Sequence, residues 1–276
     1  MAERATTVVV AVVQMASGPD KRENTVRAVE LVGQAADTGA SVIALPETFD
    51  YRGDRLDLNN IAEPLPGSAL HPLLAVARKR KVWILAGSIH ESDPAGGMPF
   101  NTSVLIDPQG RMAAKYRKIH LFDIAIGDRS VTESAKYQRG REVVYADVAG
   151  MRAGLTICYD MRFPEQYRLL ADAGADVVFI PSSFTAPTGE AHWEVLLRAR
   201  AIENQCFVVA PGQAGMGAGG IATYGNSMIV DPWGRILARA GSEAETIISA
   251  VLDFDEMAGI RRRLPALDNR KSSAIR

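Results

Sequence analysis

The amino-acid sequence predicts an α/β fold in which two sheets pack face to face with helices outside. Short aliphatic runs of strand length alternate with longer segments of helical pattern, which is typical of layered α/β architecture. Two stretches of the first half also recur in the second half, in the same order. Because no Ser/Gly-rich linker separates the halves, we expect one domain over residues 1–276, with a core of about 8–255 and a tail over 256–276.

Strand-length runs occur along the whole chain. They predict strands at Val8–Met15, Ser41–Leu45, Val82–Ser88, Thr102–Ile106, Gly154–Cys158, Asp176–Ile180, Cys206–Ala210, Ser227–Val230 and Ile247–Leu252. Helices fit between them. The apolar spacing of residues 21–38 predicts a helix that ends at Gly39, and residues 165–173 predict one that ends at Gly174, because glycine accepts the left-handed backbone that commonly follows a helix.

Two turn sequences and two repeats organise the chain. Asp107-Pro-Gln-Gly110 and Asp231-Pro-Trp-Gly234 each combine a proline with a glycine and predict tight hairpins. Residues 39–49 align without a gap to residues 174–184, and residues 103–111 align to residues 227–235. Either short turn chemistry recurs by chance, or the domain is built from two related halves. The second interpretation places Glu47, at a strand end of the first half, near strand ends of the second.

Composition and charge exclude several classes of protein. The chain has 47% hydrophobic and 23% charged residues, and a formal net charge of −1, so no chain-wide field attracts nucleic acid. The basic stretch Met257–Arg276 is interpreted as a solvated or subunit-bridging tail. The longest aliphatic run, Val8–Val13, is too short to span a bilayer or to form a secretory leader, so we expect no membrane partner and a cytoplasmic protein.

The cysteines and histidines do not form a metal-ligand pattern, so no metal is expected. Cys158 stands where a predicted strand meets a polar turn and a proline-led helix. Such a position presents a side chain at the carboxyl edge of a sheet and suits a nucleophile, although a small buried cysteine is the alternative. Cys206 lies within an apolar run and is expected in the core.

A thiol nucleophile needs a base, and the residues leave two options. His120 or His192 would form a Cys–His pair, whereas Glu47 directly follows a buried strand, where partial burial would raise the pKa of its carboxyl toward neutrality. Lys118, beyond the first hairpin, either stabilises an oxyanion or is a solvated strand end.

Five segments in order resemble the nitrilase, or carbon-nitrogen hydrolase, superfamily, and specifically its Nit-type branch of ω-amidases and deaminated-glutathione amidases. They are Leu45-Pro-Glu-Thr-Phe49, Tyr116-Arg-Lys-Ile-His-Leu-Phe-Asp123, Ile157-Cys-Tyr-Asp-Met-Arg-Phe-Pro-Glu165, and residues 191–204 and 224–234. The resemblance extends from about Val8 to about Arg263. It implies a four-layer αββα sandwich of two pseudo-symmetric halves and a catalytic Glu–Lys–Cys triad.

That resemblance also implies residue roles. Glu47, Lys118 and Cys158 correspond to the triad, and a second glutamate that orients the lysine corresponds to Glu133, with Glu142 as the alternative. The backbone N–H of Tyr159 would assist Lys118 in holding the oxyanion. No cofactor is needed, because each step is a proton transfer or an electrostatic stabilisation.

The substrate is less constrained than the reaction. Phe49 and Tyr51 could wall a pocket, and Ser182, Ser183 and the following Phe184 should lie across the same cleft. Arg162 either pairs with a substrate carboxylate or braces the turn through nearby acids.

The branch favours hydrolysis of a small, carboxylate-bearing amide, and hydrolysis of an N-carbamoyl compound is the alternative. The remaining alternatives are that the protein is a nitrilase or a catalytically reduced binding module. A homodimer or larger even homo-oligomer is expected from the family.

Overall fold

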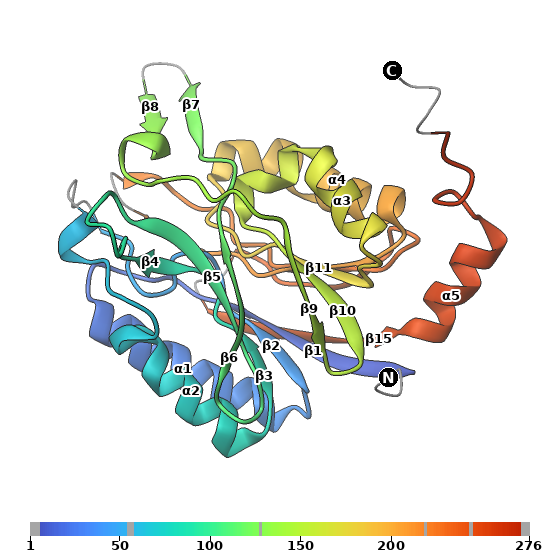
Figure 1. Cartoon of the computed structure of the whole chain (residues 1–276), viewed down its shortest axis with the longest axis horizontal. Coiled ribbons are helices and arrows are strands. Elements are labelled where there is room, and N and C mark those ends of the chain that lie inside the picture. The colour runs from blue at the N-terminus through green and yellow to red at the C-terminus, as the bar shows by residue number, and fades with distance from the viewer. Residues whose placement is uncertain (1–5, 54–57, 127–128, 218–219, 243–244, 272–276) are drawn as a thin grey trace.

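Two β-sheets pack face to face between two layers of helices (Figure 1). The computed structural model describes residues 6–53, 58–126, 129–217, 220–242 and 245–271. The first sheet contains β1 (Thr7–Gln14), β2 (Val42–Ala44), β3 (Trp83–Leu85), β4 (Ile89–Glu91), β5 (Phe100–Ile106), β6 (Met112–Arg117) and β15 (Thr246–Asp253). The second contains β9 (Val144–Val148), β10 (Met151–Leu155), β11 (Val177–Phe179), β12 (Phe207–Ala210), β13 (Met228–Val230) and β14 (Ile236–Arg239).

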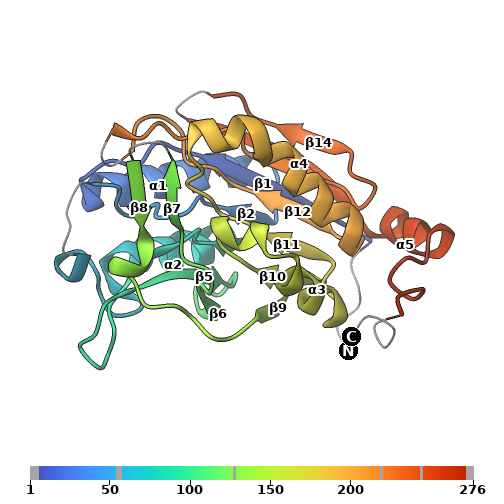
Figure 2. The same cartoon turned by 90° about the horizontal axis from the view of Figure 1, so that it is seen from above.

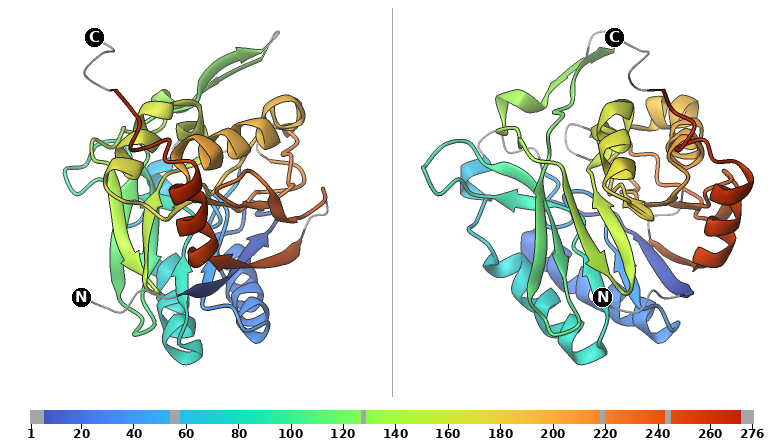
Figure 3. Two further views of the ribbon diagram at one scale, coloured as in Figure 1. Left: turned by 90° about the vertical axis from the view of Figure 1, so that its right-hand side faces the viewer. Right: turned by 45° about the vertical axis from the view of Figure 1, so that its right-hand side comes forward.

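The helices form the outer layers. Helices α1 (Lys21–Asp37) and α2 (Gly67–Arg80) cover the first sheet, while α3 (Pro164–Asp172) and α4 (Ala186–Asn204) cover the second. Figure 3 shows both sheets between the blue and cyan helices on one side and the yellow and orange ones on the other, and Figure 2 shows α4 lying along β12. The predicted αββα sandwich is therefore confirmed.

Strand β1 shows how the two cores arise. Val10 and Val12 belong to the core between the sheets, whereas Ala11 and Val13 pack with α1 and α2. Successive side chains of a strand point to opposite faces, so an uninterrupted aliphatic run suits a sheet that is covered on both sides.

The two halves repeat one topology. Strands β1, β2 and β3 pair in parallel in the first sheet, as β10, β11 and β12 do in the second. Each trio is followed by a predicted hairpin, β5–β6 and β13–β14. The repeated segments 39–49 and 174–184 contain β2 and β11, which hold equivalent positions. The strand ends of both halves consequently meet at one edge of the sandwich.

The structure differs from the sequence-based expectations in four details. The strand predicted to reach Ser88 ends at Leu85, and the strand predicted to reach Cys158 ends at Leu155. The tail begins not as solvated chain but as α5 (Phe254–Arg263), in which Met257 and Ile260 are buried. A short ribbon of β7 (Asp123–Ile126) and β8 (Arg129–Thr132) projects beyond the sheets (Figure 1). No described helix is both long and apolar enough to cross a membrane.

Candidate active site

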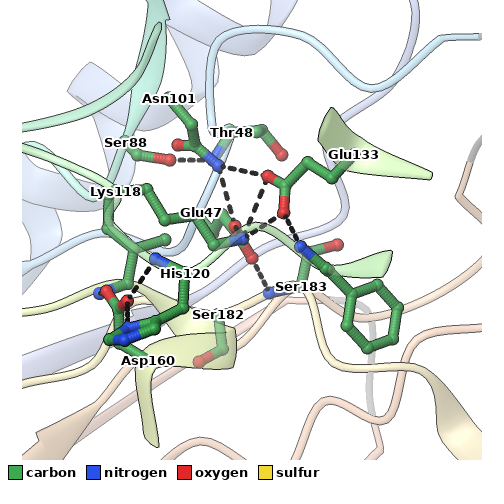
Figure 4. A network of polar contacts seen from close by, with 12 residues as sticks. Glu47, Thr48, Ser88, Asn101, Lys118, His120, Glu133, Asp160, Ser182 and Ser183 are labelled. Carbon is green, nitrogen blue, oxygen red and sulfur yellow. Dashed lines mark hydrogen bonds and ion pairs between the residues drawn. The ribbon is translucent and has the colours of Figure 1, made fainter. Parts of the chain in front are cut away.

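Strand ends of both sheets open into one cavity of about 740 Å³. Glu47 follows β2, Lys118 follows β6, Cys158 follows β10 and Ser183 follows β11, and all four line the cavity. They come from elements far apart in the chain, and the packing of the two sheets brings them together. Figure 4 shows Glu47, Lys118 and Ser183 of this group. The prediction that Glu47 lies near strand ends of the second half is confirmed.

Cys158 begins a short 3₁₀ helix, Cys158–Arg162, and has a φ of 45°. A left-handed backbone is unfavourable for a residue with a side chain, so the surrounding structure must hold it. The Cys158 N–H donates to the Pro181 carbonyl at 2.9 Å. Buried Asp160 accepts from the Ile157 N–H at 2.8 Å and from the Tyr116 hydroxyl at 2.7 Å. These bonds fix the sharp turn that presents the thiol to the cavity.

Glu47 uses both carboxylate oxygens. Its Oε1 accepts from Lys118 Nζ and from Asn101 Nδ2, each at 2.9 Å, and its Oε2 accepts from the Ser183 N–H at 2.7 Å. The thiol of Cys158 lines the same cavity and is close enough to this carboxylate to affect its pKa. Glu47 is therefore held immobile beside the sulfur by groups of both sheets.

Lys118 lies between two carboxylates (Figure 4). Its Nζ donates to Glu47 and, at 3.0 and 2.8 Å, to both oxygens of Glu133, which also accepts from the Phe122 N–H at 2.6 Å. Glu142, the other candidate, is exposed. The structure thus brings Glu133 to the lysine. Lys118 is only 2% exposed, and its bonds to Glu47 and Glu133 hold the ammonium in place.

The charges of the cluster set its protonation state. Burial alone would raise the pKa of Glu47, but the Lys118 ammonium, the hydrogen bonds from Lys118 and Ser183 and the neighbouring Cys158 thiol hold it below its ordinary value. The expectation that burial would raise this pKa toward neutrality is wrong, because it left out the lysine. Burial and the Glu47 charge raise the pKa of the Cys158 thiol well above its ordinary value.

The pKa of Lys118 rises well above its ordinary value. Burial opposes this, but the carboxylates of Glu133 and Glu47 outweigh it. The resting cluster is therefore a neutral thiol beside an ionised carboxylate and an ammonium. Such a carboxylate can accept the thiol proton once a substrate carbonyl is in position.

Several other predicted residues line the cavity, but three do not. Tyr51, Tyr159 and Ser183 are in its wall. Phe49 is fully buried among the side chains of the first sheet and does not form part of the wall.

Ser182 and Arg162 are also outside the wall. The Ser182 hydroxyl donates back to the Ile180 carbonyl. Arg162 lies outside the wall, 3.4 Å from His192 Nδ1, because the 3₁₀ turn directs it toward α4.

Neither His120 nor His192 lies where it could supply the base. His120 donates its N–H to Asp160 and places Nδ1 2.8 Å from the same carboxylate, while His192 contacts Arg162. Cys206 is buried in the core as predicted, and burial raises the pKa of its thiol to about 12.

Sequence reasoning missed Asn101 and Asp160. Asn101 Nδ2 bridges Glu47 and, at 3.2 Å, Glu133, and Asp160 holds the cysteine turn. The available signals were Asn101 among the polar residues that begin β5 and an acid two positions after the cysteine. Among the described residues, no group of three or more His, Cys, Asp or Glu side chains is arranged to hold a metal ion.

The sandwich and the buried Glu–Lys–Glu cluster beside a cysteine define a hydrolase site. Residues 9–262 match the Carbon-nitrogen hydrolase family, and the chain belongs to it. Its relatives indicate the amidase branch of this enzyme family.

Two relatives and one solved structure illustrate the match. The deaminated glutathione amidase of Synechocystis is 42% identical over 94% of this chain and 97% of its own length, and the mouse omega-amidase NIT2 is 36% identical over 95% and 94%. The crystal structure of the Caenorhabditis elegans NitFhit protein superposes with a TM-score of 0.92 at 36% identity, covering 99% of this chain and 67% of that one.

Proposed function

We propose that this amidase hydrolyses a small, carboxylate-bearing amide through a thioester on Cys158 and releases ammonia and a carboxylic acid. The observation that carries the proposal is the placement of one ionised carboxylate, Glu47, against both the thiol and the Lys118 ammonium. That arrangement supplies a base, a nucleophile and an electrophile within a single cavity.

The first half-reaction forms the thioester. Glu47 takes the thiol proton as the Cys158 sulfur bonds to the amide carbon, and the carbonyl oxygen becomes an oxyanion. The Lys118 ammonium and the Tyr159 N–H donate to that oxyanion. When the C–N bond breaks, the proton on Glu47 passes to the nitrogen, so that ammonia leaves and Glu47 is again ionised.

The second half-reaction returns the enzyme to its starting state. Glu47 takes a proton from water as its oxygen attacks the thioester carbon, and the second oxyanion occupies the same position. The C–S bond then breaks, and the sulfur recovers a proton from Glu47. Glu133 holds the ammonium in place throughout, and no step requires a cofactor.

The names of the relatives support the substrate class, since one is called a deaminated glutathione amidase and another an omega-amidase. Both names describe amide hydrolysis.

Ammonia release over a panel of ω-amides, N-carbamoyl compounds and nitriles tests this proposal, with Cys158→Ala as the matched blank. We expect ω-amides to be hydrolysed and the variant to fold normally without releasing ammonia. Substantial turnover by the variant contradicts the role of Cys158, and activity only on nitriles contradicts the amidase assignment.

A further inference from the structure

Arg52 is a buried arginine in the wall of the active-site cavity. It follows Tyr51 on the segment that carries Glu47, and only 9% of its surface is exposed. Its Nη1 donates to Gln213 Oε1 at 3.1 Å and to the Ala214 carbonyl at 3.2 Å, and its Nη2 donates to Thr223 Oγ1 at 3.3 Å. The guanidinium is thus fixed by uncharged groups.

No carboxylate of the described residues forms an ion pair with Arg52, which is unfavourable for a buried cation. The carboxylates of the cavity are already occupied, because Glu47 and Glu133 bind Lys118. Burial lowers the pKa of Arg52 to about 10, with the Glu47 charge acting in the opposite direction, so the guanidinium is still charged at neutral pH. Among the described residues that line the cavity, this guanidinium therefore has no anionic partner.

The position of the guanidinium is coupled to that of the base. Gln213 accepts from Arg52 through Oε1 and donates through Nε2 to the Glu47 carbonyl at 2.9 Å. A single side chain therefore sets the guanidinium relative to the backbone of Glu47. A ligand held by Arg52 would lie in a defined place relative to the reacting carbon.

We propose that Arg52 binds a carboxylate of the substrate, so that the enzyme selects amides with an anionic group elsewhere in the molecule. This inference rests on the proposed function and names the residue that sets its specificity. A guanidinium offers paired N–H donors that match a carboxylate, and three neutral contacts leave N–H groups available. Arg162, the arginine that the sequence suggested, lies outside the cavity wall.

A structural role is the competing explanation. The loop that contains Ala214, Gly217 and Thr223 packs on the guanidinium, and a Cβ at Gly217 would lie 2.4 Å from Arg52 Nη2. If Arg52 served only to hold this loop, its loss would affect every substrate equally. A carboxylate-binding role instead affects anionic substrates selectively.

The experiment compares two amides of equal length, glutaric acid monoamide and pentanamide, in which a methyl group replaces the carboxylate. The readout is the ratio of kcat/KM for the acid to kcat/KM for the neutral amide. We expect Arg52→Gln to lower this ratio by about 10- to 100-fold, the size of one lost charge-assisted interaction. Arg52→Lys should recover part of it, and Arg162→Gln should keep the wild-type ratio.

An unchanged ratio overturns the proposal, whether kcat/KM stays the same for both amides or falls equally for both. If Arg52→Gln does not fold, the ratio for Arg52→Lys decides, since lysine keeps the charge but not the paired donors. Failure of the proposed function is separable, because calorimetry measures binding of glutaric acid monoamide to Cys158→Ala without turnover. Weaker binding when Arg52→Gln is added to Cys158→Ala supports the assignment. Equal binding by the two proteins refutes it, as does the absence of binding to Cys158→Ala itself.

Discussion

Replacing Glu133 by glutamine tests whether this carboxylate orients the catalytic lysine. The change keeps the shape of the side chain but removes its charge and one of the two acceptors that Lys118 contacts at 3.0 and 2.8 Å. Lys118 donates to both oxygens of Glu133, and the Phe122 N–H donates to one of them. Whichever way the new amide is oriented, its NH₂ group therefore faces another donor. Loss of one hydrogen bond to a charged group is worth about 1.5–3 kcal/mol.

At about 1.4 kcal/mol per tenfold change in rate, we expect Glu133→Gln to lower kcat by roughly 10- to 100-fold. KM should change little, since the interaction aligns the ammonium for the oxyanion and not for the resting amide. Steady-state ammonia release measures both constants. Glu142→Gln is the matched control and should stay within about twofold of wild type, because Glu142 is exposed. A Glu133→Gln enzyme that keeps more than about a third of wild-type kcat refutes the reasoning.

Two further predictions concern pH and packing. Because the pKa of Glu47 is lowered, its base form is lost only as pH falls through a value below its ordinary 4.5. We therefore expect the acid limb of the pH profile of kcat/KM below that pH, and an acid limb near neutrality would contradict this. Gly140→Ala places a Cβ 2.0 Å from the Arg117 carbonyl and should cost about 1–3 kcal/mol in urea unfolding. Gly18→Ala, with nothing within 4 Å of its Cβ, should cost about 0.5 kcal/mol or less, and equal stability of the two variants would disprove the clash.

The strands and turns were predictable because their signals are local. An aliphatic run such as Val8–Val13 and a turn such as Asp107-Pro-Gln-Gly110 specify their backbone through neighbours in the chain. The elbow at Cys158 was located correctly in outline, but its strand is shorter than predicted. The turn depends on Asp160, whose partners Tyr116 and His120 are more than 30 residues away.

The electrostatics of the site required the tertiary structure. Considered alone, a buried Glu47 has a raised pKa, yet the observed shift is downward because Lys118, 71 residues away in the chain, donates to it. Similarly, nothing local distinguishes Arg52 from a solvated arginine. The hydrogen-bond partners of its guanidinium among the described residues are uncharged, and they lie on a loop more than 160 residues further along.

By itself, the sequence determined the layered α/β class, the two repeated halves and the three residues that resemble a Glu–Lys–Cys triad. Only the tertiary structure decided that Glu133 and not Glu142 faces the lysine, that Phe49 and Ser182 lie outside the cavity wall, and that Arg52 is part of it. The reason is that residue types and periodicity are encoded locally, whereas distances between side chains depend on how the two sheets pack. The Ser183 N–H, for example, donates to Glu47 although the two residues are 136 positions apart in the chain.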